Sequence, residues 1–224
     1  MARIALIGGH GKVARAAAPL LLAAGHQVES IIRNPDHAEE IRTLGAAPVL
    51  LDVEHADTEA MTEALTGYDV VVWTAGAGGG DPERTHAVDR DAAIRSMDAA
   101  ASAGVPRYVM LSYFGAGPDH GIPQDNPFFV YAESKAAADE HLRAAEALEG
   151  IVLAPSGLTD DPPTGAIEIA TGDNGVQGGS VTRADVAAVL AAVVDRTDLG
   201  GRTLAFNNGS TPVAQALEQE AARA

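Results

Sequence analysis

Tyr131 and Lys135 have residue types and a spacing that suit proton transfer. They lie four residues apart in a stretch, 129–148, that predicts a helix, so both side chains project from one face. An ammonium group near a phenol stabilises the phenolate and lowers the pKa of the tyrosine, which equips it to exchange a proton with a carbonyl or an alcohol. The same spacing also occurs on ordinary helix surfaces. It gains weight here because the chain contains only two lysines, Lys12 and Lys135.

The start of the chain suits the binding of a phosphate. A short apolar strand runs into Gly8-x-x-Gly11-x-x-Ala14, and a helix follows directly. Gly8 permits backbone angles that other residues avoid, Gly11 lets a phosphate approach the backbone, and Ala14 lets the helix pack close to the strand. Free amides at the start of the helix attract the phosphate. The residues expected to contact a dinucleotide here are Gly8, His10, Gly11, Lys12 and Val13.

Arg33 ends the second predicted strand, where a dinucleotide site recognises the ribose. An acidic residue there binds the 2′-hydroxyl group of NAD, whereas arginine suits the 2′-phosphate of NADP. Asp36 lies beyond a proline and is expected to cap the next helix. The alternative is that Arg33 is an exposed turn residue. We expect NADP(H) to be the preferred cofactor and NAD(H) to be the second choice.

Two more strand ends are expected to line the nucleotide site. Asp52 either accepts a hydrogen bond from the adenine amino group or caps the segment that follows, and Val53 comes next. Ala75 and Gly76 are small residues that let the cofactor pass close to the backbone. They open a glycine-rich loop, 75–80, which needs a ligand or a neighbouring group to hold a fixed shape.

The elements that position these residues alternate between strands and helices. The predicted strands are 3–7, 28–33, 47–51, 68–74, 106–112, 151–154 and 203–206. The predicted helices run from the glycine turn to Gly25, over 36–44, 58–65, 83–102, 129–148 and 183–194, and from Pro212. This order predicts one α/β domain, 1–224, with a doubly wound, mostly parallel Rossmann sheet and helices on both faces. Loops at about 113–127 and 155–181 would form a small substrate lobe.

Composition narrows the classes of partner. The formal net charge of −16 disfavours nucleic acid and anionic membranes as partners, since both require a positive field. The chain has no cysteine, and its histidines show no spacing typical of a metal site, so we expect no disulfide and no metal. We find neither a membrane-spanning run nor a signal peptide, and expect a cytoplasmic protein that binds a small molecule.

Taken together, these motifs resemble the short-chain dehydrogenase/reductases. The matching positions are the Gly8–Ala14 turn, Arg33, Asp52, Ala75-Gly76, Ser112 after the fifth strand, Tyr131-x-x-x-Lys135, and segments 137–143, 155–159 and 182–187. The pattern is similar to the compact atypical branch described as NAD(P)H-binding or NAD-dependent epimerase/dehydratase-like. The resemblance implies NADP(H) in the crevice, Tyr131 as acid/base, and Lys135 holding the nicotinamide ribose.

Two departures from that family concern the substrate. The family commonly has two serines after the fifth strand, whereas this chain has Ser112 followed by Tyr113. Neighbouring strand residues point to opposite faces, so either Ser112 polarises the substrate or Tyr113 donates a hydrogen bond or closes the pocket. The family's frequent arginine before the Pro-Gly segment is Ala154 here. Three phenylalanines either line an apolar substrate pocket or pack beneath the loop: Phe114, Phe128 and Phe129.

These observations favour an NADP(H)-dependent oxidoreductase that acts on a small carbonyl or alcohol, with catalytic residues Tyr131, Lys135 and Ser112. A sugar epimerase or dehydratase with the same tyrosine is one alternative. A non-catalytic NAD(P)H-binding sensor is another, which the altered serine position would suit. The helices at 83–102 and 129–148 are compatible with a monomer or with a homodimer.

Overall fold

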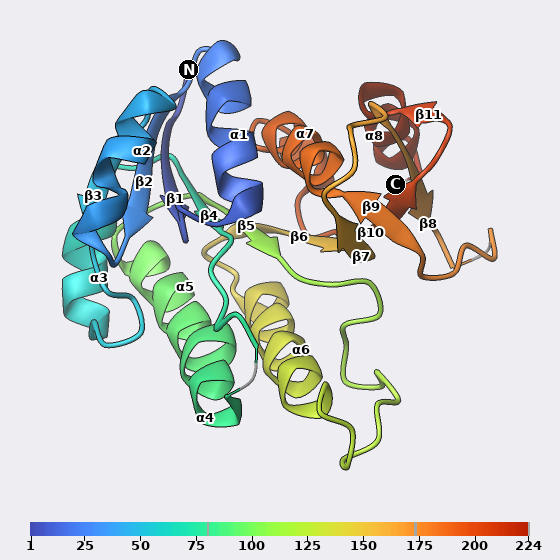
Figure 1. Cartoon of the computed structure of the whole chain (residues 1–224), viewed down its shortest axis with the longest axis horizontal. Coiled ribbons are helices and arrows are strands. Elements are labelled where there is room, and N and C mark those ends of the chain that lie inside the picture. Colours follow the sequence, from blue (N-terminus) through green and yellow to red (C-terminus); the bar gives the residue numbers. More distant parts are fainter. Residues whose placement is uncertain (80, 173, 224) are drawn as a thin grey trace.

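A nine-stranded sheet forms the centre of the protein (Figure 1). The computed structural model describes residues 1–79, 81–172 and 174–223. The strand order is β11-β8-β10-β6-β5-β4-β1-β2-β3, parallel from β10 to β3 and antiparallel where β8 meets β10 and β11. Two short parallel strands, β7 and β9, pair separately. The predicted doubly wound Rossmann architecture is confirmed.

The elements have the following bounds. The strands are β1 Arg3–Ile7, β2 Gln27–Ile32, β3 Ala47–Leu50, β4 Val70–Trp73, β5 Arg107–Leu111, β6 Glu149–Pro155, β7 Gly157–Thr159, β8 Ala166–Ala170, β9 Ser180–Thr182, β10 Thr203–Asn208 and β11 Thr211–Pro212. The α-helices are α1 Lys12–Ala23, α2 Ala38–Thr43, α3 Thr58–Leu65, α4 Pro82–Thr85, α5 Ala93–Ser102, α6 Phe129–Ala144, α7 Arg183–Val193 and α8 Val213–Ala221. None of the described helices is long and apolar enough to cross a membrane.

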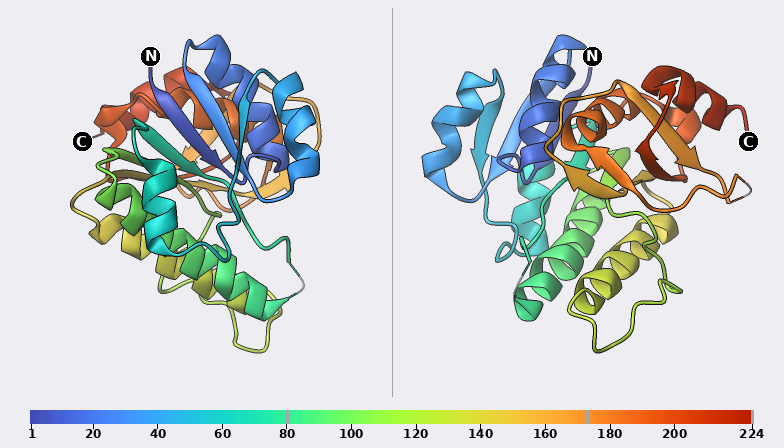
Figure 2. Two further views of the ribbon diagram at one scale, coloured as in Figure 1. Left: turned by 90° about the vertical axis from the view of Figure 1, so that its left-hand side faces the viewer. Right: turned by 45° about the vertical axis from the view of Figure 1, so that its right-hand side comes forward.

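Alternating apolar residues give the sheet two buried faces. In β1, Ile4 and Leu6 join the core beneath α1 and α7, while Ala5 and Ile7 join the core beneath α3 and α5. This follows from the two-residue period of a strand. The views in Figure 2 show the same two layers of helices on opposite sides of the sheet. Trp73, the last residue of β4, is fully buried.

The structure corrects several predicted elements. Three short strands, β7, β8 and β9, lie within or at the end of the predicted loop at about 155–181, and the short strand β11 precedes the C-terminal helix. The predicted helix 83–102 is divided into α4, a π-helical segment His86–Ala92, and α5. The predicted helix 129–148 ends at Ala144.

The turn after β2 differs from the prediction in its capping residue. Asn34, rather than Asp36, caps the short 3₁₀ turn that precedes α2, and its side chain accepts a hydrogen bond from the Asp36 amide. Asn34 takes this role because a cap must lie outside the helix, in extended backbone.

Candidate functional site

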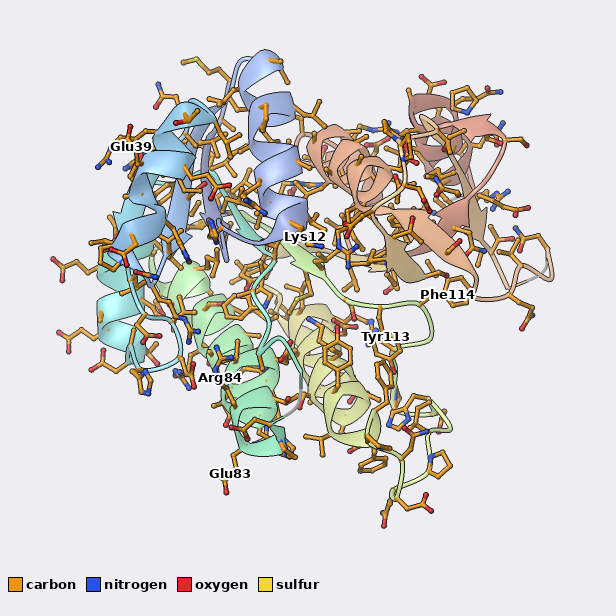
Figure 3. All side chains as sticks on the ribbon, in the orientation of Figure 1. Lys12, Glu39, Glu83, Arg84, Tyr113 and Phe114 are labelled. Atoms are coloured by element: carbon orange, nitrogen blue, oxygen red, sulfur yellow. The ribbon has the colours of Figure 1, made fainter. Side chains whose placement is uncertain are left out.

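A pocket of about 1100 Å³ lies at the carboxyl ends of the central strands. Its walls come from the glycine turn before α1, the loop after β4, the end of β5, the first turns of α6, and the segment after β6. Figure 3 shows Lys12 at the start of α1, with Tyr113 and Phe114 on the segment after β5. Parallel α/β sheets place ligand sites at this edge. Segments far apart in the sequence therefore meet around one cavity.

The glycine turn is fixed by close packing. Gly8 has a φ of +78°, and a Cβ atom there would lie 2.6 Å from the Ala75 amide nitrogen. A Cβ atom at Gly9 would lie 2.5 Å from the Ser30 Cβ atom. Gly11 donates its amide to the Gly8 carbonyl oxygen at 2.8 Å and lines the pocket. The turn thus presents bare backbone at the start of α1, which suits a phosphate.

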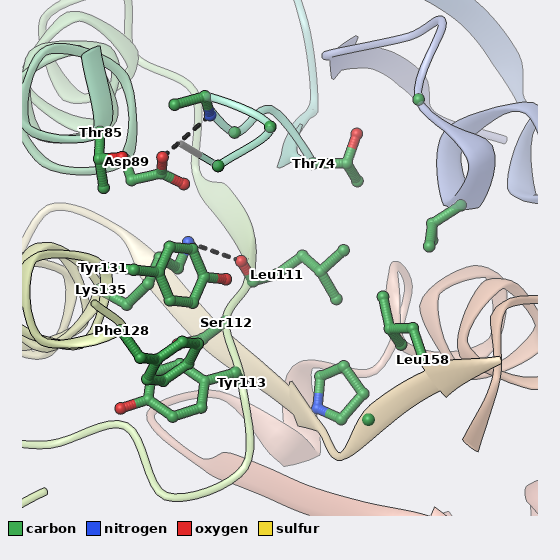
Figure 4. Close-up of a pocket in the computed structure, with 18 of the residues that line it drawn as sticks. Thr74, Thr85, Asp89, Leu111, Ser112, Tyr113, Phe128, Tyr131, Lys135 and Leu158 are labelled. Carbon is green, nitrogen blue, oxygen red and sulfur yellow. Dashed lines mark hydrogen bonds between the residues drawn. The ribbon is translucent and has the colours of Figure 1, made fainter. Parts of the chain in front are cut away.

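Tyr131 and Lys135 both line this pocket from α6 (Figure 4). The Tyr131 hydroxyl points toward the open middle of the pocket. Lys135 is 1% exposed, and its Nζ atom donates to the Leu111 carbonyl oxygen at 2.7 Å. The predicted helical spacing therefore places a phenol and an ammonium group beside the same cavity.

The electrostatic environment of the tyrosine differs from the expectation. Burial raises the pKa of Tyr131, and the Asp89 and Asp139 carboxylates and the Tyr113 phenol raise it further. The expected lowering by Lys135 is wrong for this environment, because burial and the nearby acidic groups prevail. Burial also lowers the pKa of Lys135, while Asp139 and Asp89 oppose that shift. Tyr131 is consequently a protonated phenol at neutral pH.

Asp139 is a buried acidic residue that sequence reasoning missed. It follows Lys135 by four residues on α6 and is fully buried. The Ser112 Oγ atom donates a hydrogen bond to Asp139 Oδ2 at 2.5 Å. Burial raises the pKa of Asp139, and Lys135 opposes that shift. The recurrence of polar residues at 131, 135 and 139 was the signal that could have found it.

Asp89 supplies the neighbouring group that the glycine-rich loop requires. Its Oδ2 atom accepts a hydrogen bond from the Ala77 amide at 2.9 Å, and Asp89 is 2% exposed. It projects from the π-helical segment His86–Ala92, a local widening of the helix that is frequent at functional sites. Asp89 is buried and lines the pocket. Gly80, the last residue of that predicted loop, lies outside the described residues.

Tyr113 lines the pocket with its ring. Its hydroxyl points away from the Tyr131 hydroxyl and is buried without a hydrogen-bond partner among the described residues (Figure 4). Of the phenylalanines weighed for the pocket, Phe114 and Phe128 line it. Phe129 instead packs edge-on against His120, with ring centroids 5.6 Å apart.

Arg33 and His10, two residues expected to bind the dinucleotide, lie outside the pocket lining. The Arg33 guanidinium lies 3.3 Å from Glu54 Oε2 and is largely exposed. His10 stacks on His37 at 3.5 Å between ring centroids. Glu40 pairs with His10 at 2.7 Å and also with Arg15. Arg33 and His10 are thus each paired with an acidic neighbour, Glu54 and Glu40.

Asp52 has a local structural role. Its Oδ1 atom accepts a hydrogen bond from the Glu54 amide at 3.1 Å, and its Oδ2 atom lies 3.0 Å from His55 Nδ1. Asp52 thus caps the segment that follows it, which is one of the two roles predicted for this residue.

Lys12 and Arg183 approach each other across one acidic residue. The Lys12 Nζ atom lies 2.6 Å from Asp160 Oδ2, and an Arg183 nitrogen lies 2.8 Å from Asp160 Oδ1. Both cations line the pocket and begin helices, α1 and α7. A carboxylate therefore occupies the position where two cations and two helix starts would attract an anionic ligand. No local pattern in the sequence indicates this long-range contact.

The pocket brings together only part of the predicted set. The predicted residues that line it are Gly11, Lys12, Val13, Ala75, Gly76, Ser112, Tyr131 and Lys135. The predicted residues outside its lining are Gly8, His10, Arg33, Asp52 and Val53. An elongated dinucleotide fits this division, since the glycine backbone at Gly11 and Gly76 faces the pocket and the positive groups lie beyond it.

Comparisons with known proteins agree with this architecture. A family described as NAD(P)H-binding matches residues 8–197. A Bacillus subtilis protein named "Uncharacterized sugar epimerase YhfK" is 29% identical over 220 residues, which cover 97% of this chain and 99% of that protein.

Two solved structures are similar over nearly the whole chain. A Bacillus halodurans protein, described provisionally as an NAD-dependent epimerase/dehydratase, has a TM-score of 0.89 and 29% identity over 98% of this chain and all of that one. The oxidoreductase ylbE of Lactococcus lactis has a TM-score of 0.85 and 27% identity, and the match covers 97% of this chain and 95% of that one. The chain belongs to the NAD(P)H-binding family.

Proposed function

We propose that the protein is an NADP(H)-dependent oxidoreductase that acts on a small carbonyl or alcohol. The observation that carries the proposal is the shared pocket: the Tyr131 hydroxyl, the Lys135 side chain and the bare backbone at Gly11 line one cavity. A bound nicotinamide nucleotide supplies or accepts hydride, and the surrounding residues orient the substrate and move its proton. The family membership supports the cofactor class.

Tyr131 is the proton donor in the direction of carbonyl reduction. Its raised pKa keeps the phenol protonated at neutral pH, and its hydroxyl points into the cavity. Lys135, anchored on the Leu111 carbonyl oxygen, places a positive group beside the same space. A cation there favours the phenolate that remains after the proton is donated, against the net effect of burial, Asp89 and Asp139, which favours the phenol. Ser112, bound to Asp139, fixes the end of β5 against α6.

Arg33 supports the preference for NADP(H). The residue that ends β2 is neutral, and Arg33 follows it with its side chain largely exposed. Its partner Glu54 also binds Arg84 at 3.1 Å. Arg33 can therefore turn to a 2′-phosphate while Glu54 keeps Arg84 as its ion-pair partner. Arginine recognises phosphate through paired, charge-assisted hydrogen bonds.

A non-catalytic nucleotide sensor is the second candidate. One observation favours it: the Ser112 hydroxyl is directed to Asp139, so a serine donor for the substrate is not in place. A sensor would bind NADPH and show no dependence on Tyr131. The epimerase alternative is favoured by the name of the Bacillus subtilis relative.

Titration and turnover together test the proposal. Calorimetry with NADPH and NADH measures cofactor binding, and a panel of quinones, aldehydes and ketones measures NADPH oxidation. Tyr131→Phe should keep NADPH affinity and lose at least about 100-fold in turnover, the usual contribution of a general acid. Tyr68→Phe is the matched control, because it removes a phenol that binds Glu29 outside the pocket. Turnover unaffected by Tyr131→Phe would refute the mechanism.

A further inference from the structure

We propose that the substrate of this site is a planar aromatic carbonyl compound, such as an aryl ketone or a quinone, rather than a sugar or a nucleotide-sugar. The inference rests on the proposed function and adds the chemical class of the substrate. It is carried by an aromatic wall beside Tyr131 and by the commitment of the pocket's polar side chains to partners within the protein.

The aromatic wall consists of Tyr113, Phe128 and Tyr131. The Tyr113 and Phe128 rings are perpendicular, with centroids 5.1 Å apart. Tyr131 lies 5.1 Å from Phe128 and 5.5 Å from Tyr113, tilted against both. All three rings line the pocket. Edges and faces of aromatic rings presented at these angles give a further flat ring favourable stacked and edge-to-face positions.

Apolar surface remains exposed on both sides of the part of the pocket that contains the aromatic wall. Phe128 is 40% exposed and Leu158 is 37% exposed, and both line the cavity. Figure 4 shows Leu158 across the open space from Tyr131, Tyr113 and Phe128. Exposed apolar side chains that face one another across a cavity are typical of a site for an apolar ligand. A flat ring between these walls would cover the exposed surface of both.

The neutral polar groups near the wall already have partners or point elsewhere. Ser112 donates its hydroxyl to Asp139, and the Ser156 hydroxyl accepts the Gly179 amide at 3.1 Å. The Tyr113 hydroxyl points away from that of Tyr131. The Tyr131 hydroxyl faces the cavity and can donate to one carbonyl oxygen, while Ser156, an acceptor for the Gly179 amide, retains one O–H donor. A sugar, whose several hydroxyl groups each need a partner, would lose hydrogen bonds on entering.

The charged side chains that line the described pocket are also held by partners. Lys12 and Arg183 bind Asp160, and Lys135 binds the Leu111 carbonyl oxygen. Asp89 accepts the Ala77 amide, and Asp81 caps α4. None of the five belongs to the aromatic wall. An uncharged substrate therefore suits the part of the pocket beside that wall better than a diphosphate.

A matched pair of ketones tests the inference. Acetophenone and cyclohexyl methyl ketone have the same heavy-atom skeleton and carbonyl group, and differ in that one ring is flat and aromatic. Ligand-observed NMR would give their dissociation constants with the protein alone and with saturating NADP⁺. We expect acetophenone to bind at least about threefold more tightly, the scale of one aromatic contact. UDP-glucose serves as the rival ligand.

Two adjacent phenylalanines supply the variant and its control. Phe128→Leu replaces a ring of the wall by an aliphatic side chain and should bring the affinity ratio of the two ketones to below about twofold. Phe129→Leu changes a ring that packs on His120 and lies outside the pocket lining, and should leave the ratio unchanged. Phe128 is half-exposed, so its substitution should preserve the fold, which circular dichroism would verify.

The outcomes separate this inference from the proposed function. A ratio below threefold in the unaltered protein, a ratio that Phe128→Leu leaves unchanged, or tighter binding of UDP-glucose than of acetophenone would overturn the aromatic assignment. Failure of NADPH binding or of Tyr131-dependent turnover would instead overturn the oxidoreductase. The ketone affinities of the protein alone do not depend on either of those results.

Discussion

The two halves of the pocket are built in different ways. The cofactor half is one contiguous run of chain, from β1 through the glycine turn into α1, with Ala75 packed beneath it. The substrate half is assembled from the segment after β5, the start of α6, and strand β7, which pairs with β9. The shape of the first half is set by one continuous segment of the chain, whereas the second half forms only when segments distant in the sequence come into contact. A fold can therefore keep its cofactor while its substrate changes.

Glycines show the same contrast at the level of atoms. A Cβ atom at Gly8 would collide with the Ala75 backbone, whereas one at Gly117, in the segment after β5, would meet nothing within 4 Å. The glycine turn has no space for a side chain at Gly8, while the loop after β5 accepts added volume at Gly117.

The largest expected effect is on stability. Gly8→Ala should lower the free energy of unfolding by about 2–5 kcal/mol, because it combines a left-handed backbone with an overpacked contact. Gly117→Ala, the control from the other half, should change it by less than about 0.5 kcal/mol. Urea denaturation measures both. Equal effects would remove the contrast between a packed turn and an open loop.

The next effect concerns the far end of the cofactor. Arg33→Ala should weaken NADPH binding by about 10- to 100-fold, the value of a hydrogen bond to a charged group, and leave NADH binding unchanged. Arg42→Ala is the matched control, since Arg42 pairs with Glu39 on the exposed side of α2. Calorimetric titration distinguishes the two. Equal weakening of both nucleotides by Arg33→Ala would argue against a 2′-phosphate contact.

A change of pH dependence should follow from Asp89, which joins the two halves. Its carboxylate raises the pKa of Tyr131 and also that of Lys135, so Asp89→Asn should lower both. Carbonyl reduction requires protonated Tyr131, and its rate is lost as pH rises through that pKa. The loss should therefore begin at lower pH in the variant than in the unaltered protein.

The pH profile of kcat for ketone reduction measures that shift. The other ionisable groups acting on Tyr131, namely Asp139 and Tyr113, remain in place in Asp89→Asn. Asp91→Asn is the control, because Asp91 pairs with Arg90 and does not act on Tyr131. An alkaline shift would contradict the assigned direction.

The smallest expected effect is at the Lys12–Asp160–Arg183 contact. Asp160→Asn removes the charge that holds both cations and should tighten NADPH binding by about two- to fivefold, the scale of an exposed ion pair. Asp161→Asn, one residue further along the chain, is the control. Weaker binding in Asp160→Asn would mean that the carboxylate helps to arrange the site.

The sequence predicts the strand, the glycine turn and the helix at the start of the chain, because their signals are local. A strand, a glycine turn and a helix follow one another within 23 residues, and each has its own residue pattern. The i, i+4 spacing of Tyr131 and Lys135 likewise places both residues on α6, beside the same pocket. What could not be predicted depends on long-range contacts: the burial of Asp139 against Ser112, the bridge at Asp160, and strands β7 and β9, three residues each.

Charge effects in the site were also beyond a reading of the sequence. The expected influence of Lys135 on Tyr131 considers two side chains on one helix. Burial of the phenol and the carboxylates of Asp89 and Asp139 depend on three-dimensional packing, and they set the direction of the Tyr131 pKa. Helical spacing predicts which groups are neighbours but not how strongly water is excluded from them.

Tyr131, Lys135 and Asp139 follow one another at four-residue spacing along α6. The chemistry of the site therefore depends on the direction in which each of these side chains leaves the helix axis. Each residue of an α-helix turns its side chain by about 100°, so residues four apart remain nearly aligned. One residue inserted after Tyr131 would rotate that phenol away from Lys135 and Asp139 while every functional group remained in the chain. Insertions in the segment before α6 would leave this alignment intact. We therefore expect relatives with different substrates to vary in the length of that segment and to keep the phase of the helix.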